Sequence, residues 1–99
     1  MQIEPEKMAE RSRDAEQFLK LLGNSKRLMI LCVLLEEEMS VGDLNARVPL
    51  SQSALSQHLS VLRAAGLVAT RREGQSIFYR LADARVARVL HVLYDIFCD

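Results

Sequence analysis

The sequence lacks tryptophan and has little proline and glycine, with two prolines and four glycines among its 99 residues. No stretch therefore has the composition of a flexible linker or a low-complexity region. Long apolar runs are also absent, since the longest, residues 28–35, is far shorter than the roughly 20 residues of a membrane-spanning helix. Residues 1–20 are too rich in charge for a signal peptide. We therefore expect one globular domain, residues 1–99, that remains in the cytoplasm and contacts no membrane.

Cysteine is scarce as well, because Cys32 and Cys98 are the only two. Permanent disulfides are rare in cytosolic proteins. Two interpretations stay open: a reactive thiol pair, or a small core residue at position 32 together with an idle thiol at position 98. A small thiol oxidoreductase is an alternative class of function. Neither a Cys-x-x-Cys motif nor a convincing set of serine, histidine and carboxylate occurs, so we expect the protein not to be an enzyme.

Net charge is absent, because 13 basic and 13 acidic residues cancel. A balanced total argues against a nucleic-acid partner, since phosphate neutralisation requires lysine and arginine. The distribution is uneven, however. Residues 40–80 contain five basic and two acidic residues, whereas residues 1–39 contain six and eight, and residues 81–99 contain two and three. Positive charge is thus concentrated in the middle of the chain.

Four segments before residue 66 carry apolar residues at helical spacing. They are residues 8–22, a segment from Ser25 to the acidic residues 36–38, a short segment after Ser40, and a segment after Ser51. The three serines are the expected N-caps. In the last segment a narrow stripe of leucines leaves glutamine, serine and arginine side chains on the outside. The sequence therefore predicts four helices, the fourth with a polar outer face that is not acidic.

Two strands and a last helix are predicted after Gly66. Residues 67–71 and 76–80 are typical of strands around the glycine-containing turn 72–75. The helix runs from the cap Asp83 to Phe97, and its apolar face is wider than one stripe, which favours contact with both a core and a partner. The fold class is mainly α with a β-hairpin, a winged helix-turn-helix. We expect the helix-turn-helix at about residues 40–65, the wing at about 67–81, and a homodimer through terminal helices at about 8–22 and 83–97.

The polar helix and the basic hairpin together indicate a DNA interface. Glutamine can pair with adenine and serine can contact several bases in the major groove, while arginines bind phosphates. The alternatives are that the polar side chains only solubilise an exposed helix, or that the fold is a structural or protein-interaction winged helix. For His58 we also expect a buttressing role beneath the helix. The predicted DNA-binding residues are Ser51, Gln52, Ser53, Ser56, Gln57, His58, Ser60, Arg63, Arg71, Arg72, Gln75 and Arg80.

Several of these residues belong to recognisable motifs. The run LSQSALSQHL at 50–59, Leu62-Arg63, Gly66-Leu67-Val68 and RREGQSIFY at 71–79 closely resemble the ArsR/SmtB family of bacterial repressors. The resemblance covers roughly residues 15–98. It implies a homodimer that binds an imperfect inverted repeat in double-stranded DNA and releases it when an inducer is sensed.

Many members of this family sense metals, but this sequence lacks the cysteines and histidines that bind the metal in those members. Residues 38–44, EMSVGDL, match the Glu-Leu-Cys-Val-Cys-Asp-Leu motif of the arsenic and cadmium sensors without either thiol. The zinc positions of the last helix fall on Asp83, Arg85, Ile96 and Asp99, where both imidazoles are missing. The resemblance therefore implies neither a metal site nor a cofactor, and zinc, cadmium and arsenite are not expected inducers.

Cys32 and Cys98 match a different branch of the family. Cys32 follows an Ile-Leu pair and Cys98 follows an aromatic residue, as in the dithiol members that sense reactive sulfur or other thiol oxidants. This resemblance implies that the two thiols become linked within one subunit, directly or through extra sulfur atoms. Most of the family represses transcription directly. An alternative known in this branch is an anti-silencer, which raises transcription by displacing a silencing protein.

Overall fold

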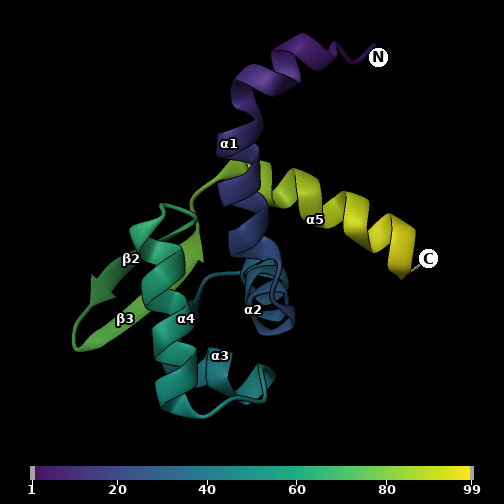
Figure 1. The fold of residues 1–99 in the computed structure, drawn as a ribbon. Helices are drawn as coiled ribbons and strands as arrows, with labels where there is room; N and C mark the ends of the chain where they lie inside the picture. Colours follow the sequence, from purple (N-terminus) through teal and green to yellow (C-terminus); the bar gives the residue numbers. More distant parts are fainter. Residues whose placement is uncertain (1, 99) are drawn as a thin grey trace.

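The helices and strands follow one another along the chain in the order that the sequence predicts, with one additional strand. The computed structural model describes residues 2–98 and is shown in Figure 1. The fold class is confirmed as a mainly α winged helix-turn-helix. The helices are α1 (Pro5–Leu22), α2 (Ser25–Glu36), α3 (Val41–Arg47), α4 (Gln52–Ala64) and α5 (Ala84–Phe97), and the strands are β1 (Met39–Ser40), β2 (Val68–Glu73) and β3 (Ser76–Leu81).

Side-chain caps begin four of the helices. Ser40 Oγ accepts a hydrogen bond from Asp43 N at 3.2 Å and Ser51 Oγ accepts one from Ala54 N at 3.1 Å, as the sequence predicts. The expectation for α2 is wrong by one residue, because Asn24 is its N-cap and Ser25 is already helical. The amide oxygen of Asn24 accepts from the backbone of both Lys26 and Arg27, so it satisfies two of the backbone donors that have no partner within the helix.

The sheet has a strand that the sequence analysis misses. β1 pairs with β3 through Met39 and Tyr79 and through Ser40 and Phe78, giving the strand order β1-β3-β2. A strand of two residues has no periodicity that a sequence pattern can reveal. The hairpin turn is also tighter than expected: Arg72 and Glu73 lie in β2, opposite β3, and Gly74, at φ +63°, begins a two-residue turn.

The core surrounds α2. Ile30, Leu31 and Leu34 of this helix are buried, and α2 contacts α1, α3, α5 and β3. Leucines of α4 belong to the same core. At the end of α4, Gly66 at φ +80° donates to Arg63 O, while Leu67 N donates to Leu62 O at 3.0 Å. These two bonds form the terminal motif that typically requires a glycine, and they direct the chain from α4 into β2.

The N-terminal part of α1 and the C-terminal part of α5 project away from this core (Figure 1). Val86 and Leu90 in the first half of α5 are buried, but the second half exposes Val92, Ile96 and Phe97, the last to 78%. The wide apolar face predicted for this helix is therefore real, and the protein's own core covers only part of it. Within residues 2–98 no helix is both long and apolar enough to span a membrane.

Candidate nucleic-acid interface and thiol pair

The helix-turn-helix is held by short-range hydrogen bonds. Asn45 Nδ2 in α3 donates to Leu50 O at 2.8 Å, which closes the turn between α3 and α4. Leu44 and Val48 are fully buried beneath this turn. A hydrogen bond and buried apolar side chains both fix the turn, so α4 leaves α3 in one defined direction (Figure 1). The outer face of α4 is exposed.

The outer face of α4 contains most of the predicted base-contacting residues. Leu55, Leu59 and Leu62 are buried on the inner side of the helix. Residues 52–64 include no acidic side chain, so nothing on this face repels a phosphate backbone. The predicted residues that the structure brings together as exposed side chains at or next to this helix are Ser51, Gln52, Ser53, Ser56, Gln57, Ser60 and Arg63.

His58 lies differently from its neighbours on α4. It is half-buried, and its Nδ1 atom accepts a hydrogen bond from Arg27 Nε of α2 at 3.1 Å. The imidazole therefore occupies the junction between α4 and α2 rather than the exposed face. This position agrees with the buttressing role expected from the sequence.

The wing presents fewer free cations than its sequence suggests. Arg71 forms ion pairs of 2.6 Å with both Glu38 and Glu73, and its guanidinium lies over the ring of Phe78 at 4.7 Å. Hydrogen bonds to Glu38 first, and then to Glu73, raise the pKa of Arg71 further above its usual value. The two carboxylates would compete with a DNA phosphate for the donors of Arg71, and its phosphate contact stays a prediction.

The other basic residues of the interface are available. Arg63, Arg72 and Arg80 are exposed, as is Gln75 in the turn of the hairpin. Within the described part of the chain, no ion pair involves any of these three arginines. These three arginines lie at the C-terminal end of α4 (Arg63) and on the two strands of the wing (Arg72 and Arg80).

The two thiols lie on α2 and directly after α5, two helices that contact each other. Both cysteines are free and exposed, so the interpretation of Cys32 as a core residue is wrong. Partial burial raises the pKa of the Cys32 thiol, and negative charge on Cys98 and on Glu36 raises it further.

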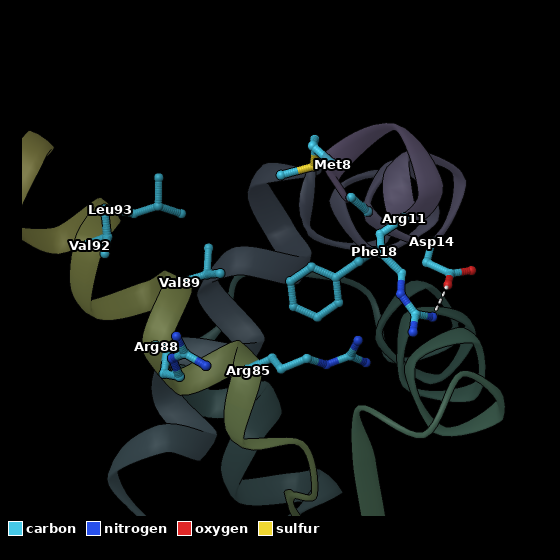
Figure 2. A pocket seen from close by; sticks show the side chains of 10 residues that line it. Met8, Arg11, Asp14, Phe18, Arg85, Arg88, Val89, Val92 and Leu93 are labelled. Carbon is cyan, nitrogen blue, oxygen red and sulfur yellow. Dashed lines mark ion pairs between the residues drawn. The ribbon is translucent and has the colours of Figure 1, made fainter. Parts of the chain in front are cut away.

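A groove lies between α1 and α5 (Figure 2). Its volume is about 710 Å³. The guanidinium of Arg85 lies over the ring of Phe18 at 4.8 Å, and Arg11 pairs with Asp14 at 3.8 Å on its rim. Sequence analysis did not find this groove, although the wide apolar face of the last helix forms one of its walls. The apolar lining residues are Met8, Ala15, Phe18, Val89, Val92 and Leu93.

The residues at the family's metal positions have other roles in this structure. Asp83 is the N-cap of α5, accepts from Arg85 N at 2.9 Å and pairs with the Arg85 guanidinium at 2.6 Å. Those contacts lower the pKa of the Asp83 carboxyl, with the Arg85 side chain as the main cause. Asp99 lies outside the described residues. From residue 2 to residue 98, no three histidine, cysteine or acidic side chains gather as a metal site would require.

Comparison with known proteins places these features among transcription regulators. The sequence model for bacterial regulatory proteins of the arsR family matches residues 24–70. The transcriptional activator HlyU of Vibrio cholerae is 47% identical over 94 residues, which are 95% of this chain and 87% of that protein. The nodulation protein NolR of Rhizobium meliloti is 50% identical over 99 residues, 100% of this chain and 81% of that protein. The crystal structure of the transcriptional repressor BigR from Xylella fastidiosa superposes with a TM-score of 0.93 at 43% identity, covering 98% of this chain and 99% of that one.

The raised pKa of Cys32 predicts how this thiol reacts with an alkylating agent. The alkylation rate with iodoacetamide, followed at Cys32 by mass spectrometry, should reach its midpoint at a higher pH than for an ordinary cysteine. In Cys98→Ser the midpoint should fall, because the repelling thiolate is gone. Glu36→Gln is the matched comparison and should lower it less, since Glu36 is the smaller influence. An unchanged midpoint in Cys98→Ser would show that the two thiols do not interact.

Proposed function

This chain belongs to the ArsR family of bacterial regulatory proteins, and we propose that it is a homodimeric repressor controlled by the thiols Cys32 and Cys98. It is a DNA-binding transcription regulator, like relatives that are described as a repressor and as an activator. The proposal adds three parts to this: the DNA-binding residues, the dimer and the thiol switch. Its place of action is the bacterial cytoplasm, where the DNA lies.

The exposed, acid-free face of α4 is the observation that carries the DNA-binding part of the proposal. α4 is the second helix of the helix-turn-helix, the position that enters the major groove in such motifs. Its glutamines have the paired donor and acceptor that match an adenine edge, and its serines can contact several bases. Arg63, Arg72, Arg80 and the turn residue Gln75 would then contact the phosphate backbone. Arg71 joins them only if a phosphate replaces one of its carboxylates.

Base and phosphate contacts predict different results for two substitutions. Gln57→Ala should lose discrimination between DNA sequences, by about 1 to 3 kcal/mol if the glutamine makes a bidentate base contact. Arg72→Ala should weaken binding to every sequence and reduce the dependence of affinity on salt. Fluorescence anisotropy with a duplex selected by the wild-type protein and a scrambled duplex, at several salt concentrations, separates the two effects. Equal losses on both duplexes for both variants would contradict the assignment.

A second copy of the chain is the proposed occupant of the α1–α5 groove. The groove has six apolar lining residues, and α5 exposes Ile96 and Phe97 beyond it; monomers rarely leave large apolar regions uncovered. An interface made by the same helices from each copy is self-complementary, as a twofold dimer requires. The dimer would place the two α4 helices about 34 Å apart, matching successive major grooves of an inverted repeat.

Disrupting this region should separate the two copies. Val92 lines the groove and is 55% exposed, so Val92→Asp would bury a charge at the interface, a change that is strongly unfavourable. We expect a monomer by sedimentation equilibrium and a large loss of affinity for an inverted repeat. Ile77→Asp, an acid introduced at an exposed apolar residue of the wing, should remain dimeric. A Val92→Asp protein that still sediments as a dimer would exclude this interface.

The thiol switch rests on two exposed cysteines carried by α2 and by the end of α5, two helices that contact each other. A Cys98 thiolate can attack one sulfur of a disulfide or polysulfide, forming a mixed disulfide and releasing the first thiolate. Deprotonated Cys32 then attacks the Cys98 sulfur, forming the Cys32–Cys98 bond and releasing the second thiolate. We assign the resolving step to Cys32 because its raised pKa leaves less of it as thiolate. A direct bond needs Cα atoms within about 7 Å, and inserted sulfur atoms relax that limit.

The link would act on DNA through the two helices that it joins. α2 leads through β1 into α3 and α4, while α5 belongs to the proposed dimer interface. Fixing one to the other can therefore change the spacing of the two α4 helices. If the linked dimer fits its site worse by about 3 kcal/mol, affinity falls roughly a hundredfold.

Removing either thiol should abolish the response. We expect polysulfide to reduce the affinity of the wild-type protein for its selected duplex roughly a hundredfold, and dithiothreitol to restore it. Cys32→Ser and Cys98→Ser should bind the duplex as the reduced wild-type protein does, with or without polysulfide. If either variant still responds fully, the dithiol mechanism is wrong, although DNA binding by α4 would stand.

Activation is a second candidate outcome of DNA binding. The relative HlyU, 47% identical, is described as a transcriptional activator, and displacement of a silencing protein would give that result with the same DNA interface. Expression from a promoter that the protein binds separates the two: deletion of the gene raises expression under repression and lowers it under anti-silencing.

A further inference from the structure

A single hydrogen bond connects the recognition helix α4 to the central helix α2. Arg27 Nε donates to His58 Nδ1 at 3.1 Å in a half-buried setting. Across residues 2–98 it is the only side-chain hydrogen bond between these two helices. Both ends are well held, because the Asn24 side chain accepts from Arg27 N at 3.1 Å and the neighbouring Leu55 and Leu59 anchor His58 in the core.

The contacts of α4 explain why this bond matters. α4 packs mainly on α3 and on β2, whereas α2 packs on α1, α3, α5 and β3. α3 has seven residues and β2 belongs to the wing, while the leucines of α4 join the core that also contains α2. Such apolar burial is non-directional. The bond to Arg27 is therefore the polar connection between the recognition helix and the helix around which the core is built.

The chemistry of the bond defines both partners. An arginine Nε–H can only donate, so the Nδ1 atom of His58 must be the acceptor and the imidazole proton must lie on Nε2. Arginine does not lose its proton in proteins, which keeps the donor permanent. Within the described residues, neither side chain pairs with a carboxylate. In this partly desolvated setting the bond is directional, so it restricts the rotation of α4 relative to α2.

We propose that Arg27 and His58 are positioning residues that hold α4 at the angle needed to contact base edges. This inference rests on the proposed role of α4 in DNA binding. Non-specific affinity arises from phosphate charge and tolerates small rotations of a helix, whereas base contacts depend on the placement of each donor and acceptor. Loss of the pair should therefore reduce the preference for a specific duplex. Non-specific affinity should change only by the amount expected from the charge that the substitution removes.

A ratio of two affinities tests this proposal. One probe is a duplex selected from a random pool by the wild-type dimer, and the other is a scrambled duplex of equal length. Arg27→Met and His58→Leu should each lower the ratio of specific to non-specific affinity roughly three- to tenfold, the effect of one net hydrogen bond. The double variant should lose little more than either single one, because both remove the same bond.

Two variants serve as matched controls. Lys26→Met removes a positive charge from the same turn of α2, so it should weaken both affinities equally and keep the ratio. His58→Asn places an amide oxygen near the position of Nδ1 at similar helix propensity, so it should keep most of the ratio. If His58→Leu does not fold, the comparison of Arg27→Met with Lys26→Met carries the test by itself.

The imidazole tautomer gives a readout independent of DNA. Nitrogen-15 NMR of the wild-type dimer should show the His58 proton on Nε2, and Arg27→Met should shift the ring toward a mixture of tautomers. A proton on Nδ1 in the wild type, or an unchanged ratio in both single variants, would overturn the proposal. Failure of the wild-type protein to enrich any duplex would overturn the DNA-binding function itself, and this inference with it.

Discussion

The burial of α2 at the centre of the molecule is the constraint on which the rest of the structure depends. Ile30, Leu31 and Leu34 are almost completely removed from water, and burial of side chains of this size contributes about 1.5 to 3 kcal/mol each. A helix surrounded by α1, α3, α5 and β3 cannot move without disturbing all of them. It is also the helix that carries Cys32 and Arg27, so one rigid element connects the thiol pair with the junction to the recognition helix.

Electrostatics in this protein are local, which reconciles a net charge of zero with a DNA-binding surface. The acidic residues of the chain lie mostly outside residues 40–80, and α4 has none. In the wing, the number of arginines in the sequence is larger than the number of arginines without a carboxylate partner. Arg71 is neutralised by Glu38 from the loop after α2 and by Glu73 from its own strand, and only Arg72 and Arg80 remain free of carboxylates there. The ion pairs also stack Arg71 on Phe78, so this arginine stabilises the sheet.

The apolar side chains of α5 are divided between the core and a second, exposed surface. Val86 and Leu90 complete the core, while Val92, Ile96 and Phe97, further along the same helix, lie in water. The N-terminal half of α1 similarly projects beyond the core (Figure 1). A helix that continues past the core it covers has no stabilising contact of its own in a monomer, and short isolated helices are marginal in water. The projecting ends of α1 and α5 therefore expose apolar surface, part of which lines the groove between the two helices.

The sequence by itself determined the order of the helices, three of the caps, the polar face of α4 and the surplus apolar face of α5. All of these are local, because helical periodicity, capping serines and a glycine with positive φ act within a few residues of one another. What only the tertiary structure decided are the pairings between distant positions: β1 with β3, Glu38 with Arg71, Arg27 with His58, and the helix that carries Cys32 with the helix that precedes Cys98. Such pairs are separated by more than thirty residues, and no local pattern encodes them. They exist because burial of α2 brings the ends of several elements to fixed places around one core.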